Sequence, residues 1–351
     1  MGFWGRWFGT RRPAPAIRQE PPALRSAEDV RALAVQCGFG EAAALIETLA
    51  RPCADMLYAG PGDGAPVGAS RLGGAPDLPA ETVWPASPSG RPLSFYGQVD
   101  LATPELAGLS PNLPDAGLLS LFVGAVEGGM QPAPVRALLI PAGAALARRP
   151  WPAPAEAFDD EGTARLNPVA VRFERRLSFP MLDARVTDPI AAVCPSGDID
   201  ALVDGLQASS AADAQGLGEL LGQVLGQPSA PFDNLPEAVH FHEIGRPGQE
   251  RLRLWSTWED WEQAKTIASR LRNGTIYRPW SADDDGNVRW LLAHRAEIDA
   301  GVASWRVLMV VESNKPMQLW INDADPVYVL IRASDLARGD LSQVRAMATQ
   351  G

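Results

Sequence analysis

Histidines are few enough in this 351-residue chain for acid–base and metal chemistry to be considered one residue at a time. His240 and His242 lie two apart, and on a strand both imidazoles would share one face, a spacing that can supply two metal ligands. Val239 and Phe241 alternate with them, so the segment also fits a half-exposed strand with its polar side chains outward. Because no third ligand is near in the sequence, we predict no metal and keep His240 and His242 as candidates.

Cysteines give no second source of chemistry. Cys37, Cys53 and Cys194 are odd in number, widely spaced and without a C-x-x-C pair, which argues against a disulfide framework or a zinc site and favours a reducing compartment. A thiolate in Cys194-Pro-Ser-Gly-Asp198 could act as a nucleophile, but the sequence supplies no adjacent base. We therefore expect a turn that leads into a helix, in a cytoplasmic protein.

Acidic residues gather in the segment Asp283-Asp284-Asp285-Gly286-Asn287. If Gly286 took the sixth place of a calcium loop, Leu292 would take the twelfth, where a bidentate Glu is needed, so an EF-hand is excluded. We expect a polar turn that leads into a helix capped by Asn287.

Strong catalytic and cofactor motifs are absent: the sequence contains no phosphate-binding loop, dinucleotide fingerprint, zinc-protease motif or nucleophile elbow. The formal net charge is −11 and the isoelectric point is near 4.9, which excludes a generic phosphate-binding surface. We expect no cofactor and no nucleic acid, and the partner to be a protein or a small molecule. Whether the protein is an enzyme stays open, and the absence of these motifs favours a non-catalytic protein.

The N-terminal residues leave two interpretations open. No apolar run reaches the roughly 18 residues of a membrane span, and the start lacks the apolar core of a signal peptide. Trp4, Trp7 and Arg11-Arg12 could bring residues 1–12 against an anionic membrane. A flexible tail is the favoured interpretation of the same residues.

Between Tyr58 and Asp188, short apolar runs separated by Gly and Pro predict strands. Because Pro cannot donate to a ladder, these strands must be short or at an edge, which disfavours a parallel Rossmann-type sheet. The runs are Leu93–Leu101, Leu118–Val126, Val135–Ile140 and Val169–Leu177.

Helices are predicted on both sides of these runs. Ser26 is typical of a helix cap, and Ser256-Thr-Trp-Glu259 forms a capping box. The predicted helices are Ser26–Gly38, Glu41–Ala50, one or two within Asp198–Leu225, Ser256–Asn273 and Val288–Ala300, followed by strands Arg306–Glu312 and Pro326–Ile331.

Polar side chains interrupt the apolar strand Leu93–Leu101. Gln98 and Asp100 lie two apart and share a face, which Tyr96 joins if the alternation is strict. This polar row fits a solvated face, bonds to the turn at Asp115-Ala-Gly117, or the lining of a groove, and all three stay open.

The surrounding segment carries a resemblance. It contains, in order, Ser70-Arg-Leu-Gly-Gly-Ala-Pro-Asp-Leu-Pro79, Trp84-Pro85, Gly90-Arg-Pro-Leu93, Gln98-Val-Asp100 and Leu113-Pro-Asp-Ala-Gly117. This succession resembles the YwqG-like family, a bacterial domain of unknown function. The resemblance implies no reaction, cofactor or substrate.

The C-terminal part resembles the same family in weakened form. Trp305–Ser313 matches a strand that usually ends in Q-I-D-S, and Trp320-Ile-Asn-Asp-Ala-Asp325 matches W-G-D-A-G. Val310 stands where the family has Gln, and Asp325 where it has Gly. Because Phe95–Phe122 and Leu308–Ile331 share one plan of strand, acid, turn and strand, we predict an internal duplication.

Together these patterns predict an α+β fold, with a β-rich core of short, mostly antiparallel strands built from two pseudo-repeats and with interspersed helices. The expected divisions are a basic, Pro-rich tail 1–25, a helical segment 26–57, and a YwqG-like domain 58–351 whose halves 58–190 and 230–351 are joined by a helical segment 195–229.

Two functions from different classes stay open. The first is a non-catalytic protein-binding module of the interaction or immunity type, for which the many tryptophans are suited. The second is an enzyme or small-ligand binder with a cleft between the two pseudo-repeats. The candidate binding residues are Arg71, Tyr96, Gln98, Asp100, Trp320 and Asp323.

Overall fold

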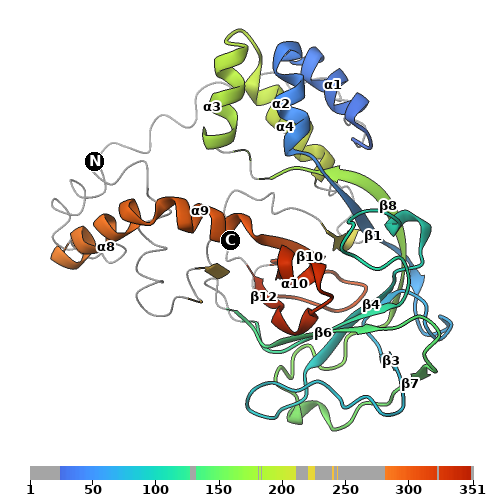
Figure 1. The fold of residues 1–351 in the computed structure, drawn as a ribbon. Helices are drawn as coiled ribbons and strands as arrows, with labels where there is room; N and C mark the ends of the chain where they lie inside the picture. Colours follow the sequence, from blue (N-terminus) through green and yellow to red (C-terminus); the bar gives the residue numbers. More distant parts are fainter. Residues whose placement is uncertain are drawn as a thin grey trace, which may run out of the picture.

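A large antiparallel sheet dominates the protein, and helices lie beside it (Figure 1). The structure is a computed structural model that describes residues 24–126, 132–180, 182, 184–210, 220–225, 239–240, 243, 281–321 and 324–348. Every strand pairing in these residues is antiparallel. The predicted α+β class with a β-rich core is therefore confirmed.

The sheet has ten strands in the order β12-β11-β10-β9-β1-β8-β2-β4-β5-β6. It curves until its two outer strands approach each other, and Ala133 N–H donates to Ala346 O at 2.7 Å across the seam. The sheet is thus nearly a barrel, which leaves little free strand edge. The strands are β1 (Arg51–Pro61), β2 (Arg71–Leu72), β4 (Ser94–Asp100), β5 (Leu118–Val123), β6 (Val135–Ile140), β8 (Val169–Ser178), β9 (Leu220–Val224), β10 (Trp305–Val311), β11 (Val327–Arg332) and β12 (Arg345–Ala348).

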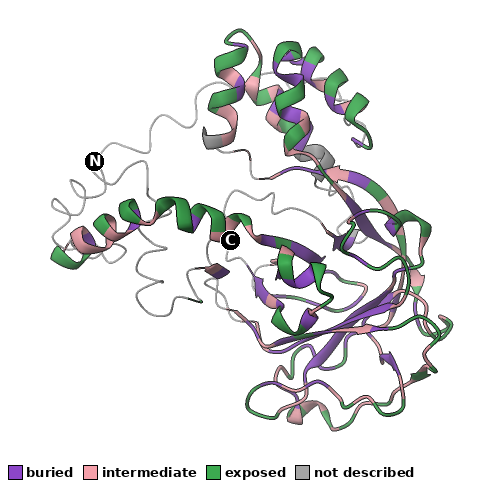
Figure 2. Cartoon of the chain, in the orientation of Figure 1, coloured by how far each residue is buried: buried purple, intermediate pink, exposed green. Residues whose placement is uncertain are grey.

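Apolar side chains fill the inside of this barrel. Most of the ribbon of its strands is coloured as buried in Figure 2. The inward residues of the strands are joined there by side chains from two long connections. Leu106 and Leu113 enter from the β4–β5 connection, and Met317, Leu319 and Ile321 enter from the β10–β11 connection. Both connections are therefore fixed to the core by burial of apolar surface.

A helical lobe with its own apolar cluster lies at one end of the barrel (Figure 1). As predicted, Ser26 caps the first helix: its hydroxyl accepts from Asp29 N–H, and the Asp29 carboxylate accepts from Ser26 N–H. The lobe consists of α1 (Ala27–Gln36), η1 (Gly40–Ala42), α2 (Ala43–Leu49), α3 (Ala184–Val193) and α4 (Ile199–Ser210).

A two-stranded ribbon, β3 (Asp77–Leu78) with β7 (Ala147–Arg148), forms a separate small sheet. Leu78 packs with the outward side chains Phe95 and Phe122 of the barrel wall, and Trp84 meets Phe122 edge to face at 5.5 Å. This layer buries part of the outer face of β4–β5–β6. The remaining elements are η2 (Pro104–Leu106), η3 (Ala155–Ala157), α10 (Ala333–Ala337) and η5 (Leu341–Gln343).

Two helix predictions are wrong at the centre of the sheet. Residues 220–224 were expected to be helical but form β9, which pairs with β1 on one side and β10 on the other. Residues 51–57 were placed in the helical segment 26–57 but belong to β1. Both segments depend on pairing with strands far away in the chain, which outweighs local propensity.

The acidic segment is also placed differently from the prediction. Ser281, not Asn287, caps the helix α8 (Ala282–Ala293), because Ser281 and Asp284 form a capping box. Asp283–Asp285 therefore form the first helical turn, where negative charge is favourable, and α9 (Arg295–Ala303) follows. The predicted helix Ser256–Asn273 lies outside the described residues.

Candidate functional site

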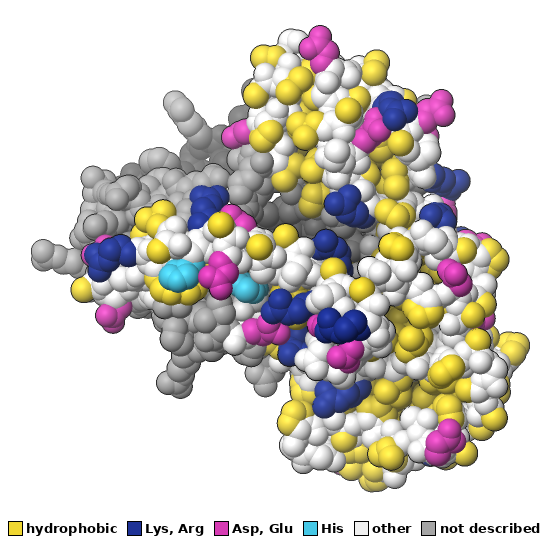
Figure 3. Space-filling model, in the orientation of Figure 1, with side chains coloured by type: hydrophobic (Ala, Val, Ile, Leu, Met, Phe, Trp, Pro, Cys, Tyr) yellow, Lys and Arg dark blue, Asp and Glu magenta, His cyan; other side chains and the backbone are white. Residues whose placement is uncertain are grey.

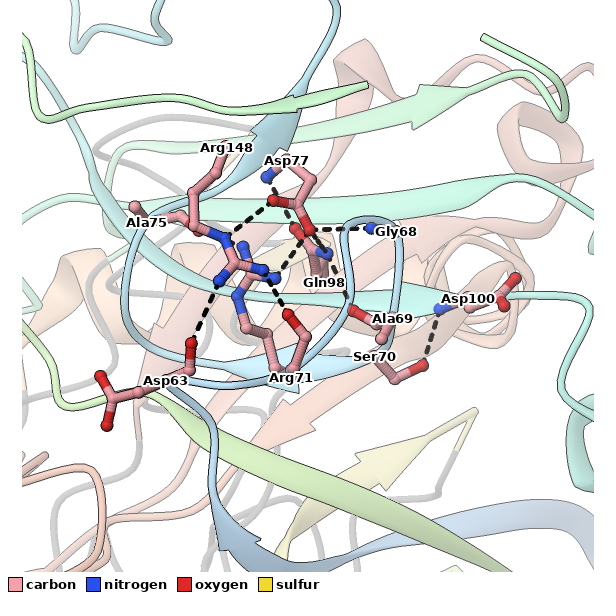
Figure 4. Close-up of polar contacts among 11 residues, drawn as sticks. Asp63, Gly68, Ala69, Ser70, Arg71, Ala75, Asp77, Gln98, Asp100 and Arg148 are labelled. Atoms are coloured by element: carbon pink, nitrogen blue, oxygen red, sulfur yellow. Dashed lines mark hydrogen bonds and ion pairs between the residues drawn. The ribbon is translucent and has the colours of Figure 1, made fainter. Parts of the chain in front are cut away.

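Arg71 and Gln98 are brought together, and they share a carboxylate that the sequence analysis did not single out, that of Asp77 (Figure 4). Arg71 Nη1 donates to Asp77 Oδ2 at 2.7 Å, and Gln98 Nε2 donates to the same oxygen at 2.8 Å. Gly68 N–H adds a third donor at 2.9 Å, and Arg148 Nε reaches Oδ1 at 3.1 Å. Four elements, β2, β3, β4 and β7, thus converge on one carboxylate.

The centre of this network is buried and satisfied, while the side chain of Arg148 at its edge is 32% exposed. Arg71, Asp77 and Gln98 are each at most 1% exposed. Burial alone would raise the pKa of Asp77, but the hydrogen bonds from Arg71, Gly68, Arg148 and Gln98 lower the pKa to about 2. A carboxylate held in its charged form by four donors is a poor proton donor or acceptor near neutral pH. The arrangement holds the β3–β7 ribbon on the barrel.

Asp100 and Tyr96 do not join this network. Asp100 N–H donates to Ser70 Oγ at 2.8 Å, and the Asp100 carboxylate accepts from Ala102 N–H at 3.0 Å, so it shapes the turn after β4. The strict alternation is wrong, because a bulge lies between Phe95 and Gly97. Tyr96 therefore lies inside the barrel core, fully buried.

Trp320 lies apart from the buried network, with 60% of its surface exposed. It follows Leu319 and precedes Ile321, both of which are buried in the barrel core. The alternation of the loop thus sends its neighbours inward and its indole toward solvent. Asp323 and His242 lie outside the described residues.

Hydrogen bonds within the β10–β11 connection hold this loop in place. Asn314 Oδ1 accepts from Met317 N–H at 2.9 Å, and Asn314 pairs with Leu319 in an isolated bridge. Ser313 Oγ donates to Asp325 O at 2.7 Å and accepts from Ile321 N–H at 3.0 Å. The loop that carries Trp320 is therefore braced from both sides.

Backbone strain also marks this loop. Gln318 has φ 58° and Ala324 has φ 84°, in the left-handed region that costs a non-glycine residue about 1–2 kcal/mol. The sequence resemblance led us to expect a glycine at the position of Asp325, yet the positive φ falls one residue earlier, at Ala324. Such strain persists where the surrounding structure determines the conformation.

The Trp320 loop meets the Gly73-Gly74 motif through one intermediate segment. Asn167 N–H donates to Met317 O at 2.9 Å, and Gly74 N–H donates to Leu166 O at 2.8 Å. A Cβ at Gly73 would collide with Asn167 O. Close approach of neighbouring chain thus explains the two glycines. Through Leu166 and Asn167, the segment that begins at Ser70 lies near the β10–β11 connection that carries Trp320.

A second polar cluster was missed by the sequence analysis. Asp55 on β1 pairs with Arg176 on β8 and accepts from Gln223 Nε2 on β9 at 3.0 Å. Burial raises the pKa of Asp55 to about 6, against the opposing effect of Arg176 and Gln223. The signal for it was a lone Asp in the apolar run Cys53–Leu57, which a helical assignment concealed.

The histidine prediction is corrected in part. Val239, His240 and Glu243 are helical, so the two-residue strand spacing does not apply. His240 packs against Gly301 of α9, and burial, with Arg332 nearby, lowers its pKa. Within the described residues, no group of three or more His, Cys, Asp or Glu is placed to hold a metal.

The cysteines are buried and unpaired: Cys37, Cys53 and Cys194 are all free thiols. Burial, with the Asp55 charge nearby, raises the pKa of Cys53 to about 12. A thiol that resists ionisation in this way is a weak nucleophile.

These features define a nearly closed antiparallel barrel with a helical lobe and a largely buried polar network beneath a small ribbon. Residues 70–138 are similar to a domain of unknown function, DUF1963. The matched residues run from β2 into β6 and include Arg71, Asp77 and Gln98. Comparison with curated proteins finds no match. Among the described helices, none has the length and apolar character needed to cross a bilayer.

Proposed function

We propose that this chain is a non-catalytic protein-binding module, and that Trp320 lies at the centre of its contact surface. The observation that carries the proposal is the exposure of this indole, 60%, on a loop where Met317, Leu319 and Ile321 are buried in the core. Tryptophan is enriched among the residues that dominate binding energy at protein interfaces.

The rigidity of the loop supports the same function. Hydrogen bonds of Ser313 and Asn314 to Met317 and Ile321 fix the described residues on both sides of Trp320 before any partner arrives. A preorganised contact loses less conformational entropy on binding, which raises affinity.

The burial of Arg71 and Gln98 supports a non-catalytic role. Arg71 and Gln98 lie in the segment that is similar to DUF1963. Their side chains donate hydrogen bonds to Asp77, Ala69 and Ala75. A catalytic group needs an unsatisfied atom within reach of substrate. These two side chains have the surroundings of structural residues.

Photo-crosslinking tests the proposal. Trp320 is replaced by benzoylphenylalanine in the full chain, in its native host, with the same replacement at Val83 as the matched control, because Val83 is 86% exposed on a distant part of the sequence. We expect a discrete cross-linked product from position 320 and none from position 83. Equal ladders from both positions, or no product from either, would reject Trp320 as a contact.

A second candidate, a small-ligand binder or enzyme, is favoured by one observation. Asp55 has a raised pKa beside Arg176 and Gln223, where the two halves of the sheet meet, and perturbed carboxyl groups gather at functional sites. A thermal-shift screen of small molecules at pH 7 tests it with Asp55→Asn as control. A ligand that stabilises the native chain but not the variant would favour this candidate over the first.

We also infer that the chain is a YwqG-like bacterial protein of the cytoplasm, with an internal duplication. The ordered motifs from Ser70 to Gly117 support the family, and three unpaired, widely spaced cysteines support a reducing compartment.

The duplication is supported by two three-stranded meanders, β4-β5-β6 and β10-β11-β12. Their first strands carry a bulge at matching places, at Tyr96 and at Leu308.

A further inference from the structure

We infer that the outer face of β10, β11 and β12 is a docking surface for a partner helix, and that Val239 and Glu243 of the same chain cover it in this structure. The partner helix carries an apolar residue and, four positions later, a carboxylate. This surface shares no residue with the Trp320 loop, so the inference goes beyond the contact proposed above.

Six apolar side chains form this face and point away from the barrel core. Other residues of β10, such as Met309 and Val311, belong to the apolar cluster inside the barrel instead. An apolar sheet face needs a cover, because leaving it in water costs free energy in proportion to its area. The six residues are Trp305, Val307 and Val310 of β10, Tyr328 and Leu330 of β11, and Met347 of β12.

Val239 and Glu243 show which chemistry the face accepts. Among the described residues, Val239 is the one member of this apolar cluster that lies outside the three strands. Glu243 pairs with Arg332 of β11 at 2.5 Å and with Arg345 of β12 at 3.4 Å. Because both covering residues are helical, positions 239 and 243 lie on one side of a helix. One helix side thus presents an apolar residue to the strands and a carboxylate to two arginines.

The ion pairs that fasten this cover are partly open to solvent. The side chain of Glu243 is 27% exposed, and those of Arg332 and Arg345 are each 33% exposed. Figure 3 shows arginine and acidic side chains side by side at the surface over the region of α10 and β12. Ion pairs with this exposure contribute little to stability. The ribbon over the other meander, β4-β5-β6, is instead held by the fully buried Asp77. The cover over β10-β11-β12 is therefore the one that a competitor can displace.

An unused donor on this face gives a competing helix an advantage. Trp305 is 4% exposed, and its indole Nε1 has no hydrogen-bond partner in the part of the chain that the structure describes. The Arg332 guanidinium carbon lies 4.9 Å from the centre of the same ring. A buried donor without an acceptor is costly, so a partner that brings an oxygen to Nε1 gains what the chain's own helix does not supply. A basic helix is repelled by Arg332 and Arg345.

The probe that tests this is a fluorescent peptide with the sequence of residues 232–248. A hydrocarbon bridge between positions 237 and 241 keeps the peptide helical, since these positions lie opposite 239 and 243 on a helix. The native full chain should bind the peptide weakly, because its own helix competes for the face at a high effective concentration.

Two variants of the full chain loosen the cover in different ways. Glu243→Lys places a positive charge against the two arginines, whereas Gly301→Ala adds a Cβ that would lie 2.3 Å from His240 Cε1 and changes no charge. We expect the Kd of the peptide to fall at least about tenfold for Glu243→Lys and about threefold or more for Gly301→Ala. Glu81→Lys is the matched control, because it makes the same change of charge at an exposed glutamate, and its Kd should stay within about twofold of native.

The double variant Arg332→Glu/Arg345→Glu tests the chemistry of the partner. It repels its own Glu243, so the face is open, but it should now reject the native peptide. A peptide with Glu243→Lys should bind this variant at least about tenfold more tightly than the native peptide does. The chain with Glu243→Lys should show the opposite preference.

Circular dichroism and urea unfolding show which variants are folded, and Gly301→Ala keeps the test open if a charge variant is not. No gain in peptide binding for any folded variant with a loosened cover would overturn the docking surface. Equal binding of the two peptides by an opened chain would overturn the carboxylate requirement. A dimer of the native chain that Arg332→Glu/Arg345→Glu dissociates, measured by light scattering, would replace the separate partner with a second copy of this chain.

Discussion

Asp77 and Gln98 bond each other twice: the Asp77 backbone N–H donates to Gln98 Oε1 at 2.9 Å, and Gln98 Nε2 donates to Asp77 Oδ2 at 2.8 Å. The two residues are 21 positions apart and belong to different sheets, the ribbon β3–β7 and the barrel. An amide side chain is suited to this because it can donate and accept at once. Gln98 thus connects the ribbon β3–β7 to the barrel wall through two hydrogen bonds with Asp77.

Gln98→Leu removes both halves of this link. It leaves the buried Asp77 N–H and Ala69 O without their partners, so we expect a loss of about 2–4 kcal/mol in the free energy of unfolding. Gln36→Leu is the control, because Gln36 is an exposed glutamine in the regular helix α1. Urea unfolding measures both. A loss below about 1 kcal/mol for Gln98→Leu would show that the network does not hold the ribbon.

The carboxyl groups of Asp77 and Asp55 should give opposite pH signatures. The pKa of Asp77 is lowered to about 2, so its stabilisation is present above the unfolded value of about 3.8 and is lost as the pH falls toward 2. The pKa of Asp55 is raised to about 6, so the folded state holds this proton more tightly than the unfolded chain does. Its contribution to stability is therefore largest below about pH 4 and is lost as the pH rises through 6.

Asp55→Asn and Asp77→Asn test these signs. Between pH 4.5 and 7.5, the native chain should lose of the order of 1–3 kcal/mol relative to Asp55→Asn, because the variant has no proton to release. Asp77→Asn should lower stability by nearly the same amount at both pH values. Urea unfolding midpoints measured across this pH range test both predictions. A stability difference between the native chain and Asp55→Asn that does not change with pH would contradict the raised pKa of Asp55.

Gly222 is where β9 meets its neighbour most closely. A Cβ at this position would collide with Val310 O of β10, and its φ of 147° is one that other residues rarely adopt. Gly222→Ala should therefore separate β9 from β10 and cost about 3 kcal/mol or more. The control has the opposite sign: Gly286 lies in α8, and a Cβ at this position would meet no atom within 4 Å, so Gly286→Ala should stabilise by about 0.5–1 kcal/mol. Thermal unfolding of both variants measures these changes in stability. Equal effects of Gly222→Ala and Gly286→Ala would contradict the close approach of β9 to β10.

Local signals explain what could be predicted from the sequence. The cap at Ser26 and the strands around Gln98 depend on neighbours within a few positions, and both are confirmed. The β9 strand was missed because it is short and gains its stability from β1 and β10, with Gln223 opposite Asp55 and Val310. Pairings of this range are not visible in local periodicity.

The candidate site was predictable to a similar degree. Arg71 and Gln98 were two of six candidate binding residues, and the structure brings these two together. Their role depends on Asp77 and on Arg148, which lies 71 positions after Asp77 in the chain. The bulge that turns Tyr96 inward depends on packing against β5 rather than on any residue pattern in β4. Strict alternation along β4 predicted the direction of Gln98 correctly. It predicted that of Tyr96 wrongly, because the bulge lies at Tyr96.

Tyr96 carries a hydroxyl that the barrel does not use. The residue is fully buried, and its hydroxyl has no partner that meets hydrogen-bond geometry among the described residues. Thr163 lies nearby and donates its Oγ1 to Ser94 Oγ at 3.3 Å. Burying an unpaired hydroxyl costs about 1–3 kcal/mol, so Tyr96→Phe should leave stability unchanged or raise it by about 1 kcal/mol. Tyr96→Leu, which removes the ring as well, should instead destabilise by about 2 kcal/mol or more through the cavity it leaves. Guanidinium unfolding measures both variants, and a loss for Tyr96→Phe above about 1 kcal/mol would mean that the hydroxyl is bonded in solution, by a water or by Thr163 itself.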